Sequence, residues 1–229
     1  MEQRLSPSEL AREVVWRLDA QHGRPVWKQR MPPLEELVAC ILSQHTSDVN
    51  SGRAYQQLRD RFPRWEAVMD APTQLVEETI RPGGLASSKA PRIQAVLRAI
   101  AERNGGTPSL DFLQQMDTES ARRYLLSLPG VGPKTAAIVL CFSLGRPVIP
   151  VDTHVFRVSW RLGFFDRRVG EAKAHDLLQQ MVPEEDIYAF HVHLIRHGRQ
   201  VCKAQRPRCE QCVLADLCAY RQEMLSWEV

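Results

Sequence analysis

Residues 125–152, with the sequence LLSLPGVGPKTAAIVLCFSLGRPVIPVD, are typical of two helices joined by a tight hairpin. In the hairpin, LPGVG, Gly130 and Gly132 flank one apolar residue. Glycine lets the backbone turn sharply and approach another molecule closely. Pro133 suits the first position of the second helix, because its missing N–H needs no partner there. The N–H groups of such a turn, backed by a helix N-terminus, favour an anion such as a phosphate. The stretch therefore predicts either a phosphate-binding hairpin or a plain interhelical turn.

Two residues near this hairpin carry groups suited to catalysis. Lys134 lies in the first turn of the second helix, where the positive end of the helix dipole disfavours an ammonium. Partial burial would disfavour the charge further, and a neutral lysine is a nucleophile that can form a Schiff base. The chain has five lysines against twenty-five arginines, so lysine is not its general surface charge. Asp152 precedes the next helix and can cap it, place a carboxylate beside Lys134, or do both. An ordinary solvated lysine is the competing interpretation of Lys134.

The composition is that of an ordinary globular protein. The chain has 229 residues, of which 44% are hydrophobic and 25% charged, enough for one large or two small domains. A net charge of +3 permits a polyanionic partner without requiring one. No apolar run approaches the ~20 residues of a membrane span, and the first ten residues, MEQRLSPSEL, lack the apolar core of a signal peptide. We therefore expect a cytoplasmic protein with no membrane partner.

Apolar periodicity, caps and helix breakers predict helices along the whole chain. The sequence Ser-Pro-Ser-Glu at residues 6–9 is a capping box that begins the first helix, and Gly23 ends it. The other predicted helices span residues 34–45, 47–62, 73–80, 88–103, 118–127, 133–144, 152–162, 170–181 and 184–201. Because no convincing alternating run interrupts them, the predicted fold class is all-α.

Four of the six cysteines lie within seventeen residues, at Cys202, Cys209, Cys212 and Cys218. In a reducing compartment such a C-x6-C-x2-C-x5-C run predicts a metal centre rather than disulfides. Zinc and a [4Fe–4S] cluster both accept four thiolates. Zinc modules more often contain two C-x2-C pairs and this run has one, so spacing alone leaves both open. The other two cysteines, at positions 40 and 141, lie in apolar helical stretches and are predicted to be core residues.

Three motifs together resemble the endonuclease III family of DNA glycosylases, within the helix-hairpin-helix superfamily. They are LPGVGPKTA at residues 128–136, VDTHVFRV at residues 151–158 and the cysteine run. The resemblance covers about residues 33–220. It implies a two-lobed fold with a helical barrel domain (26–146) and an iron–sulfur cluster domain (1–25 and 147–229). It also implies that the four cysteines hold a [4Fe–4S] cluster and that Lys134 and Asp152 face each other across a cleft.

The same resemblance implies a base-excision-repair enzyme that is both a DNA glycosylase and an AP lyase. Its substrates would be oxidised or ring-saturated pyrimidines and abasic sites in double-stranded DNA. Such an enzyme must take the base out of the stack. It would then act through a lysine Schiff base and β-elimination, with Lys134 and Asp152 as the catalytic residues. The resemblance further implies a monomer, associated with the nucleoid if the source is bacterial.

The resemblance assigns DNA contacts to the hairpin, to two gap-filling positions, to the helix after Asp152 and to the basic residues between the first two clustered cysteines. These residues are Gly130, Gly132, His45, Leu85, His154, Lys203, Arg206 and Arg208. By the same resemblance, Asp48 corresponds to a carboxylate that the family has near its catalytic pocket. The competing interpretation is that Asp48 is a helix N-cap. Without the resemblance, Leu85 is an apolar loop residue, His45 a helix C-cap and the basic trio solvated charge. His45 stands where the best-known family pattern has glutamine, which leaves the preferred opposite base open.

Three alternatives compete with this function. The adenine-excising branch of the family lacks a lysine at position 134 and has a glutamate where this chain has Cys40. It normally has an additional C-terminal domain, for which 229 residues leave no room. A non-catalytic DNA-binding module would use the hairpin and a structural metal only. A paralogue with weak or shifted activity is the third alternative.

Overall fold

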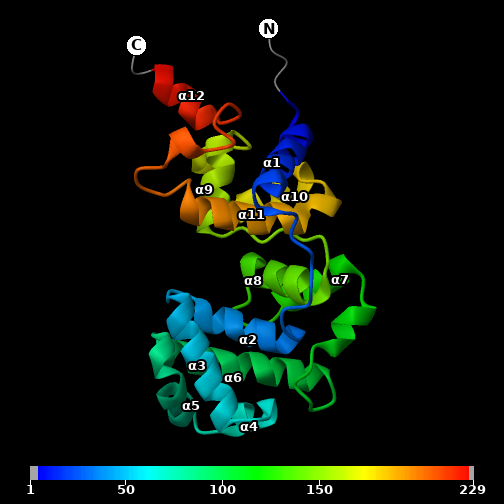
Figure 1. Ribbon diagram of the computed structural model, residues 1–229. Coiled ribbons are helices and arrows are strands. Elements are labelled where there is room, and N and C mark those ends of the chain that lie inside the picture. Colours follow the sequence, from blue (N-terminus) through cyan, green and yellow to red (C-terminus); the bar gives the residue numbers. More distant parts are fainter. Residues whose placement is uncertain (1–4, 227–229) are drawn as a thin grey trace. The chain divides into compact units, whose positions relative to one another are not determined.

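The computed structural model describes residues 5–226, and all the regular structure in that range is helical (Figure 1). The all-α prediction is confirmed. The chain divides into two compact units: Gln29–Arg146, and Met1–Lys28 together with Pro147–Val229. Within residues 5–226, no helix has the length and apolar character needed to cross a membrane.

The unit Gln29–Arg146 is built around an apolar helix and a long amphipathic helix. Its helices are α2 (Pro33–Ser43), α3 (Asp48–Arg61), α4 (Trp65–Asp70), α5 (Thr73–Ile80), α6 (Ala86–Arg103), α7 (Thr118–Leu126) and α8 (Pro133–Ile138). Helix α2 packs against α3, α6 and α8, and α6 also packs against α4 and α5. Leu37 and Ile41 of α2 and Leu97 of α6 are fully buried, as their helical spacing requires.

Helix α8 carries the start of the second helix predicted from the hairpin. Gly132 is its N-cap in an extended conformation, and Pro133 occupies its first turn. The helix continues as a wider π-helical turn over Val139–Ser143, so the predicted span 133–144 is essentially correct. The buried face of α8 includes Ala136 and Ala137, which leaves the opposite side of its first turn to solvent.

The unit that contains both termini has one continuous core. Its helices are α1 (Pro7–His22), α9 (Thr153–Leu162), α10 (Gly170–Met181), α11 (Ile187–Gln200) and α12 (Ala219–Ser226). The predicted capping box is present, since Ser6 and Glu9 bond each other's backbone N–H groups. Leu18 of α1, Val155 of α9 and Leu194 of α11 meet in the core. Leu214 joins them from the cysteine loop, residues 202–218, which ties that loop to the helices.

The structure corrects several predicted boundaries. Helices α4 and α12 were not predicted, because α4 has only six residues and α12 has no clear apolar face. Helix α6 begins at Ala86 rather than residue 88, and α11 begins at Ile187 after a short 3₁₀ turn. Helix α2 ends at Ser43, so His45 is not its C-cap; Gln44 is. The backbone of His45 has a positive φ of 54°, which no pattern in the sequence signals.

Candidate functional site

The hairpin before α8 requires glycine at its tip. Gly130 has φ +72°, and a β-carbon there would lie 2.9 Å from Cδ of Arg92. The Val131 N–H donates to the Leu128 carbonyl at 3.2 Å, which closes the turn. Gly130 is exposed, whereas Val131 is buried in the unit below it. The turn therefore presents bare backbone to solvent directly before a helix N-terminus, as a phosphate site requires.

Lys134 lies in the first turn of α8 and its side chain is exposed. Burial therefore does not disfavour the charged form of Lys134, and its place at the helix N-terminus is the feature that does so. Cys40 of α2 is buried, and it lies close enough to Lys134 for that charge to act on its thiol. Burial raises the pKa of the Cys40 thiol, and the nearby positive charges of Arg30 and Lys134 only partly oppose that effect. Cys40 is a core residue, as predicted, whereas the amine of Lys134 is open to solvent.

Asp152 caps helix α9 in the other unit. Its Oδ1 accepts hydrogen bonds from the backbone N–H groups of His154, at 2.9 Å, and Val155, at 2.7 Å. The N-cap prediction is confirmed. Both bonds use the same oxygen of a half-buried side chain, which fixes the direction of the carboxylate. A rigid carboxylate of this kind can also act as a general acid or base.

His154 is held by an arginine that the sequence analysis did not identify. Arg157 Nη2 lies 3.0 Å from His154 Nδ1 and donates to the Gly198 carbonyl at 2.8 Å. Because a guanidinium only donates, Nδ1 of His154 must be the acceptor. Burial lowers the pKa of His154, which favours that neutral ring. Arg157 Nε also donates to the Cys202 carbonyl at 3.0 Å, so one side chain joins the start of α9 to the cysteine loop.

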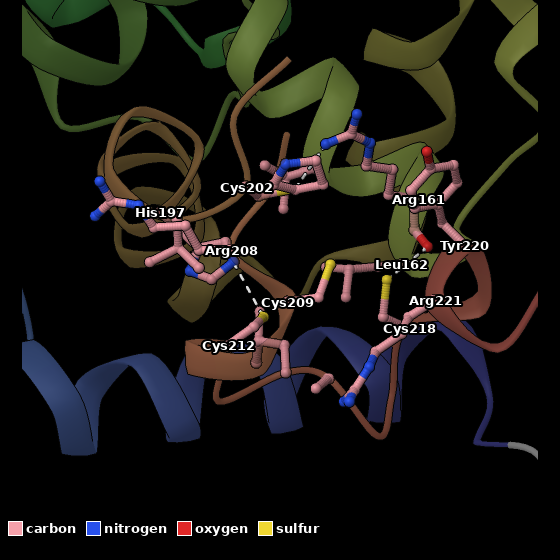
Figure 2. A pocket seen from close by; sticks show the side chains of 15 residues that line it. Arg161, Leu162, His197, Cys202, Arg208, Cys209, Cys212, Cys218, Tyr220 and Arg221 are labelled. Atoms are coloured by element: carbon pink, nitrogen blue, oxygen red, sulfur yellow. Dashed lines mark hydrogen bonds between the residues drawn. The ribbon is translucent and has the colours of Figure 1, made fainter. Parts of the chain in front are cut away.

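The four clustered cysteines line one pocket, together with side chains of α9 and α11 (Figure 2). Arg161 Nη1 donates to Cys202 Sγ at 3.2 Å, and His197 Nε2 lies 3.5 Å from Cys212 Sγ. Burial, with a smaller contribution from the charge of the other cysteines, raises the pKa of Cys212 to about 11. The same two causes raise the pKa of Cys209 and Cys218.

The pocket fits a [4Fe–4S] cluster. It offers four sulfur donors, an apolar wall that includes Leu162 and Leu214, and a guanidinium directed at one sulfur. Four thiolates cannot ionise together in so confined a place without compensating positive charge, which bound iron supplies. Arg161 donates to a sulfur, as the residues around iron–sulfur clusters do. Cys141 lies in the other unit and is buried, as predicted for a core residue.

The basic residues of the cysteine loop are exposed, and its backbone is anchored from α9. Lys203, Arg206 and Arg208 all face solvent. Arg161, which is only 6% exposed, donates to the carbonyls of Lys203, at 2.8 Å, and Ala204, at 3.1 Å. Arg161 and Arg157 lie one turn apart on α9. No pattern in the sequence identifies them, because their partners in the cysteine loop lie 41 and 45 residues further along the chain.

Within residues 5–226, the non-glycine residues with positive φ are His45, Leu85 and Arg206. All three belong to the set assigned to DNA contact by resemblance. The left-handed conformation costs on the order of 1–3 kcal/mol per residue and concentrates at functional sites. Leu85 is 57% exposed, which is unusual for an apolar side chain held in a strained conformation. The structure therefore gives these positions an independent functional signal.

Asp48 does not cap helix α3. The N-cap is Ser47, whose Oγ accepts a hydrogen bond from the Asn50 backbone N–H at 3.3 Å. Asp48 is the first residue of the helix and is exposed. The capping alternative for Asp48 is therefore wrong, and its assignment to the pocket stays a prediction.

Comparison with known proteins identifies the family. Residues 38–184 match the HhH-GPD superfamily of base excision DNA repair proteins, and residues 202–218 match the iron–sulfur binding domain of endonuclease III. The second match decides between zinc and a [4Fe–4S] cluster in favour of the cluster. The chain is 33% identical to endonuclease III of Thermotoga maritima, over 96% of both chains. It is 34% identical to endonuclease III of Escherichia coli K12, over 93% of this chain and 96% of that one.

Solved structures give the same result. A trapped covalent intermediate of endonuclease III with DNA superposes with a TM-score of 0.80 at 29% identity, over 96% of this chain and 99% of that chain. A non-covalent complex of endonuclease III with DNA superposes equally well, over 97% of this chain. The chain therefore belongs to the endonuclease III family, and it is a base excision repair enzyme, a bifunctional DNA glycosylase and AP lyase with a [4Fe–4S] cluster binding domain.

Proposed function

We propose that this chain excises oxidised or ring-saturated pyrimidines from double-stranded DNA, and cuts at abasic sites, with Lys134 as nucleophile and Asp152 as acid–base residue. The proposal rests on the exposed amine of Lys134. This residue lies in the first turn of α8, directly after the glycine hairpin. A phosphate on the hairpin would bring the sugar of a neighbouring nucleotide near that amine. The enzyme would act on DNA as a monomer in the cytoplasm, at the nucleoid of a bacterium.

The proposed reaction has three stages: loss of the base, formation of a Schiff base, and β-elimination. Neutral Lys134 Nζ forms a bond to C1′, while the bond from C1′ to the base breaks and the base leaves with its electron pair and a proton. The C1′–O4′ bond then breaks and opens the sugar ring. One proton of the lysine nitrogen has left with the base and the other passes to O4′, which gives the Schiff base. Removal of a C2′ proton then breaks the C3′–O bond, which cuts the strand 3′ to the lesion. Asp152 stabilises positive charge on the sugar and relays protons.

The remaining assigned residues bind and shape the DNA. Gly130 and Gly132 present backbone N–H groups to a phosphate, while His45 and Leu85 fill the space left by the extruded base. The other assigned residues are His154 and Asp48 at the pocket and Lys203, Arg206 and Arg208 on the phosphate backbone. In this assignment residues 26–146 form the helical barrel domain, and residues 1–25 with 147–229 form the iron–sulfur cluster domain. The complexes that endonuclease III forms with DNA support the assignment of DNA contacts.

The four cysteines hold the cluster for a structural purpose. Cys202, Cys209, Cys212 and Cys218 would each bind one iron, and the cluster supplies the bonds that close the cysteine loop. Arg161 then holds the backbone of the basic residues against that closed loop. No step of the reaction passes through the cluster.

Borohydride trapping tests the proposed reaction. Borohydride reduces a Schiff base to a stable amine, so the wild-type protein should crosslink to duplexes that contain an abasic site or an oxidised pyrimidine. A panel of lesions and opposite bases then defines the substrate range and the effect of His45. Absence of a crosslink on every duplex, with retained DNA binding, would contradict the lysine mechanism.

Asp152→Asn should separate the cap of α9 from the chemistry. Asparagine caps helices as well as aspartate does, so the thermal unfolding temperature should stay close to that of the wild type. Loss of the carboxylate should lower the single-turnover excision rate about 10²- to 10⁴-fold. The matched control is Asp117→Asn, which changes the exposed cap of α7 in the same way. Full activity of Asp152→Asn would exclude a catalytic role for this carboxylate.

Lys203→Ala should change the salt dependence of DNA binding. Each phosphate contact contributes about 0.9 to the slope of log affinity against log salt concentration, so loss of one contact should reduce the slope by about 0.9. Fluorescence anisotropy with a labelled duplex between low and moderate salt measures it. Lys173→Ala, at an exposed position of α10, is the control with the same charge change. Equal slopes for the two variants would place the cysteine loop away from DNA.

A further inference from the structure

Two exposed residues in the unit Gln29–Arg146 are held in a conformation that ordinary side chains avoid. His45 follows the end of α2 with φ 54°, and Leu85 precedes α6 with φ 50°. Neither is glycine, so neither conformation is intrinsically favoured. Such residues keep a strained backbone only when the surrounding structure fixes it. The contacts that fix these two loops come from helix α6.

A buried lysine joins the two loops. Lys89, in the first turns of α6, is 2% exposed and its Nζ donates to the Leu42 carbonyl at 2.6 Å and to the Gly83 carbonyl at 2.8 Å. Leu42 lies three residues before His45, and Gly83 lies two residues before Leu85. Lysine is rarely buried, and its ammonium must be satisfied by hydrogen bonds when it is. Here both bonds go to backbone, one at the last turn of α2 shortly before His45 and one in the 3₁₀ turn Arg81–Gly83 shortly before Leu85.

An arginine one turn further along α6 extends this connection to the hairpin. Arg92 Nη1 donates to Gln44 Oε1 at 2.7 Å, directly before His45. The stem of the same side chain packs on the hairpin tip so closely that a β-carbon at Gly130 would lie 2.9 Å from Arg92 Cδ. Residues 89 and 92 share one face of the helix because they are three apart. Side chains from one face of α6 therefore contact all three segments: the end of α2, the turn before Leu85 and the hairpin.

We propose that Lys89 and Arg92 are positioning residues that hold His45, Leu85 and the hairpin as one rigid DNA-reading surface. Neither needs to touch the nucleotide that reacts. Lys89 fixes the separation of the two gap-filling loops, and Arg92 fixes one of those loops relative to the phosphate-binding turn. The inference rests on the DNA roles proposed for His45 and Leu85. It adds that the unit displaces a base as a single body rather than through independently mobile loops.

The test measures base displacement apart from binding. A duplex with a stable tetrahydrofuran abasic analogue opposite 2-aminopurine becomes more fluorescent when protein side chains drive the 2-aminopurine out of the stack. Lys89→Met keeps the length of the side chain and removes its donor. At saturating protein, this variant should lose about half or more of the fluorescence rise, because the released loops populate other conformations. Its affinity should stay within about threefold of wild type, since phosphate contacts dominate binding.

Two further variants change the contact between Arg92 and Gln44. Arg92→Met removes the guanidinium of a half-buried side chain, so this variant provides the test if Lys89→Met does not fold. Gln44→Ala keeps Arg92 and removes only its hydrogen-bond partner. Both should reduce the fluorescence rise. If Leu85→Ala and His45→Ala reduce the rise while folded Lys89→Met and Arg92→Met retain it, the positioning role is wrong and the proposed DNA contacts stand. If Leu85→Ala and His45→Ala both retain the full rise, the proposed contacts fail, and the positioning role fails with them.

Discussion

Lys134→Ala is expected to give no borohydride crosslink on any duplex that the wild-type protein traps. The variant lacks the only atom proposed to bond to the sugar, so strand cleavage should fall at least about a thousandfold, as it does when an enzyme loses its nucleophile. DNA binding should persist, because the glycine hairpin before α8 binds through backbone groups. Lys134 is exposed, so its truncation should change the free energy of unfolding by no more than about 0.5 kcal/mol.

The control for this variant is Lys173→Ala, which removes an exposed helix lysine and should crosslink normally. Gel mobility of reduced reactions, with thermal unfolding of each variant, separates loss of chemistry from loss of fold. A crosslink that survives in Lys134→Ala would assign the Schiff base to another amine. Peptide mapping of that crosslink would then identify it.

Cys212→Ser is expected to remove the broad visible absorption of the iron–sulfur cluster and to unfold the cysteine loop. Coordination by cysteine contributes several kcal/mol to the folding of small metal-binding loops, about 10 or more for some structural sites. Here the loop also supplies Leu214 to the core of its unit, so unfolding should spread to the contact with α1. The thermal unfolding temperature should fall, and limited proteolysis should cut within residues 203–217.

Cys141→Ala is the matched control, because it removes a buried cysteine from the other unit. Burial raises the pKa of Cys141 to about 12, and Cys141 lies outside residues 202–218, which match the iron–sulfur binding domain. This variant should keep the visible absorption and the protease resistance of the cysteine loop. If Cys212→Ser also keeps both, Cys212 is not a ligand of the cluster.

Features that depend on near neighbours in the sequence could be predicted well. The capping box at Ser6 is present, Asp152 caps its helix, and two helices, Thr73–Ile80 and Gly170–Met181, have the predicted bounds. A cap bonds the backbone two or three residues away, so the sequence pattern contains both partners. Such patterns left zinc and a [4Fe–4S] cluster equally open, and only the resemblance to the family predicted the cluster.

Features that depend on distant partners could not be predicted. Lys89 bonds carbonyls 47 and 6 residues away, and the longer contact exists only once α2 and α6 have packed. The left-handed conformations of His45 and Leu85 depend on the same packing. Arg161 bonds the cysteine loop about forty residues further along the chain, at Cys202. Nothing in the sequence distinguishes these charged residues from solvated ones, because burial is a property of the assembled unit.

One property of Asp152 constrains which amino acids can stand at that position. The side chain begins α9 by bonding two backbone amides, and the proposed reaction needs its negative charge. Glutamate would keep the charge but is not a favoured cap, whereas serine and asparagine would keep the cap and lose the charge. A library of all substitutions at this position, screened once for folded protein and once for repair, should therefore give two different sets of survivors. Aspartate is expected in both sets. Residues found only in the screen for folded protein can cap α9 but cannot support the reaction.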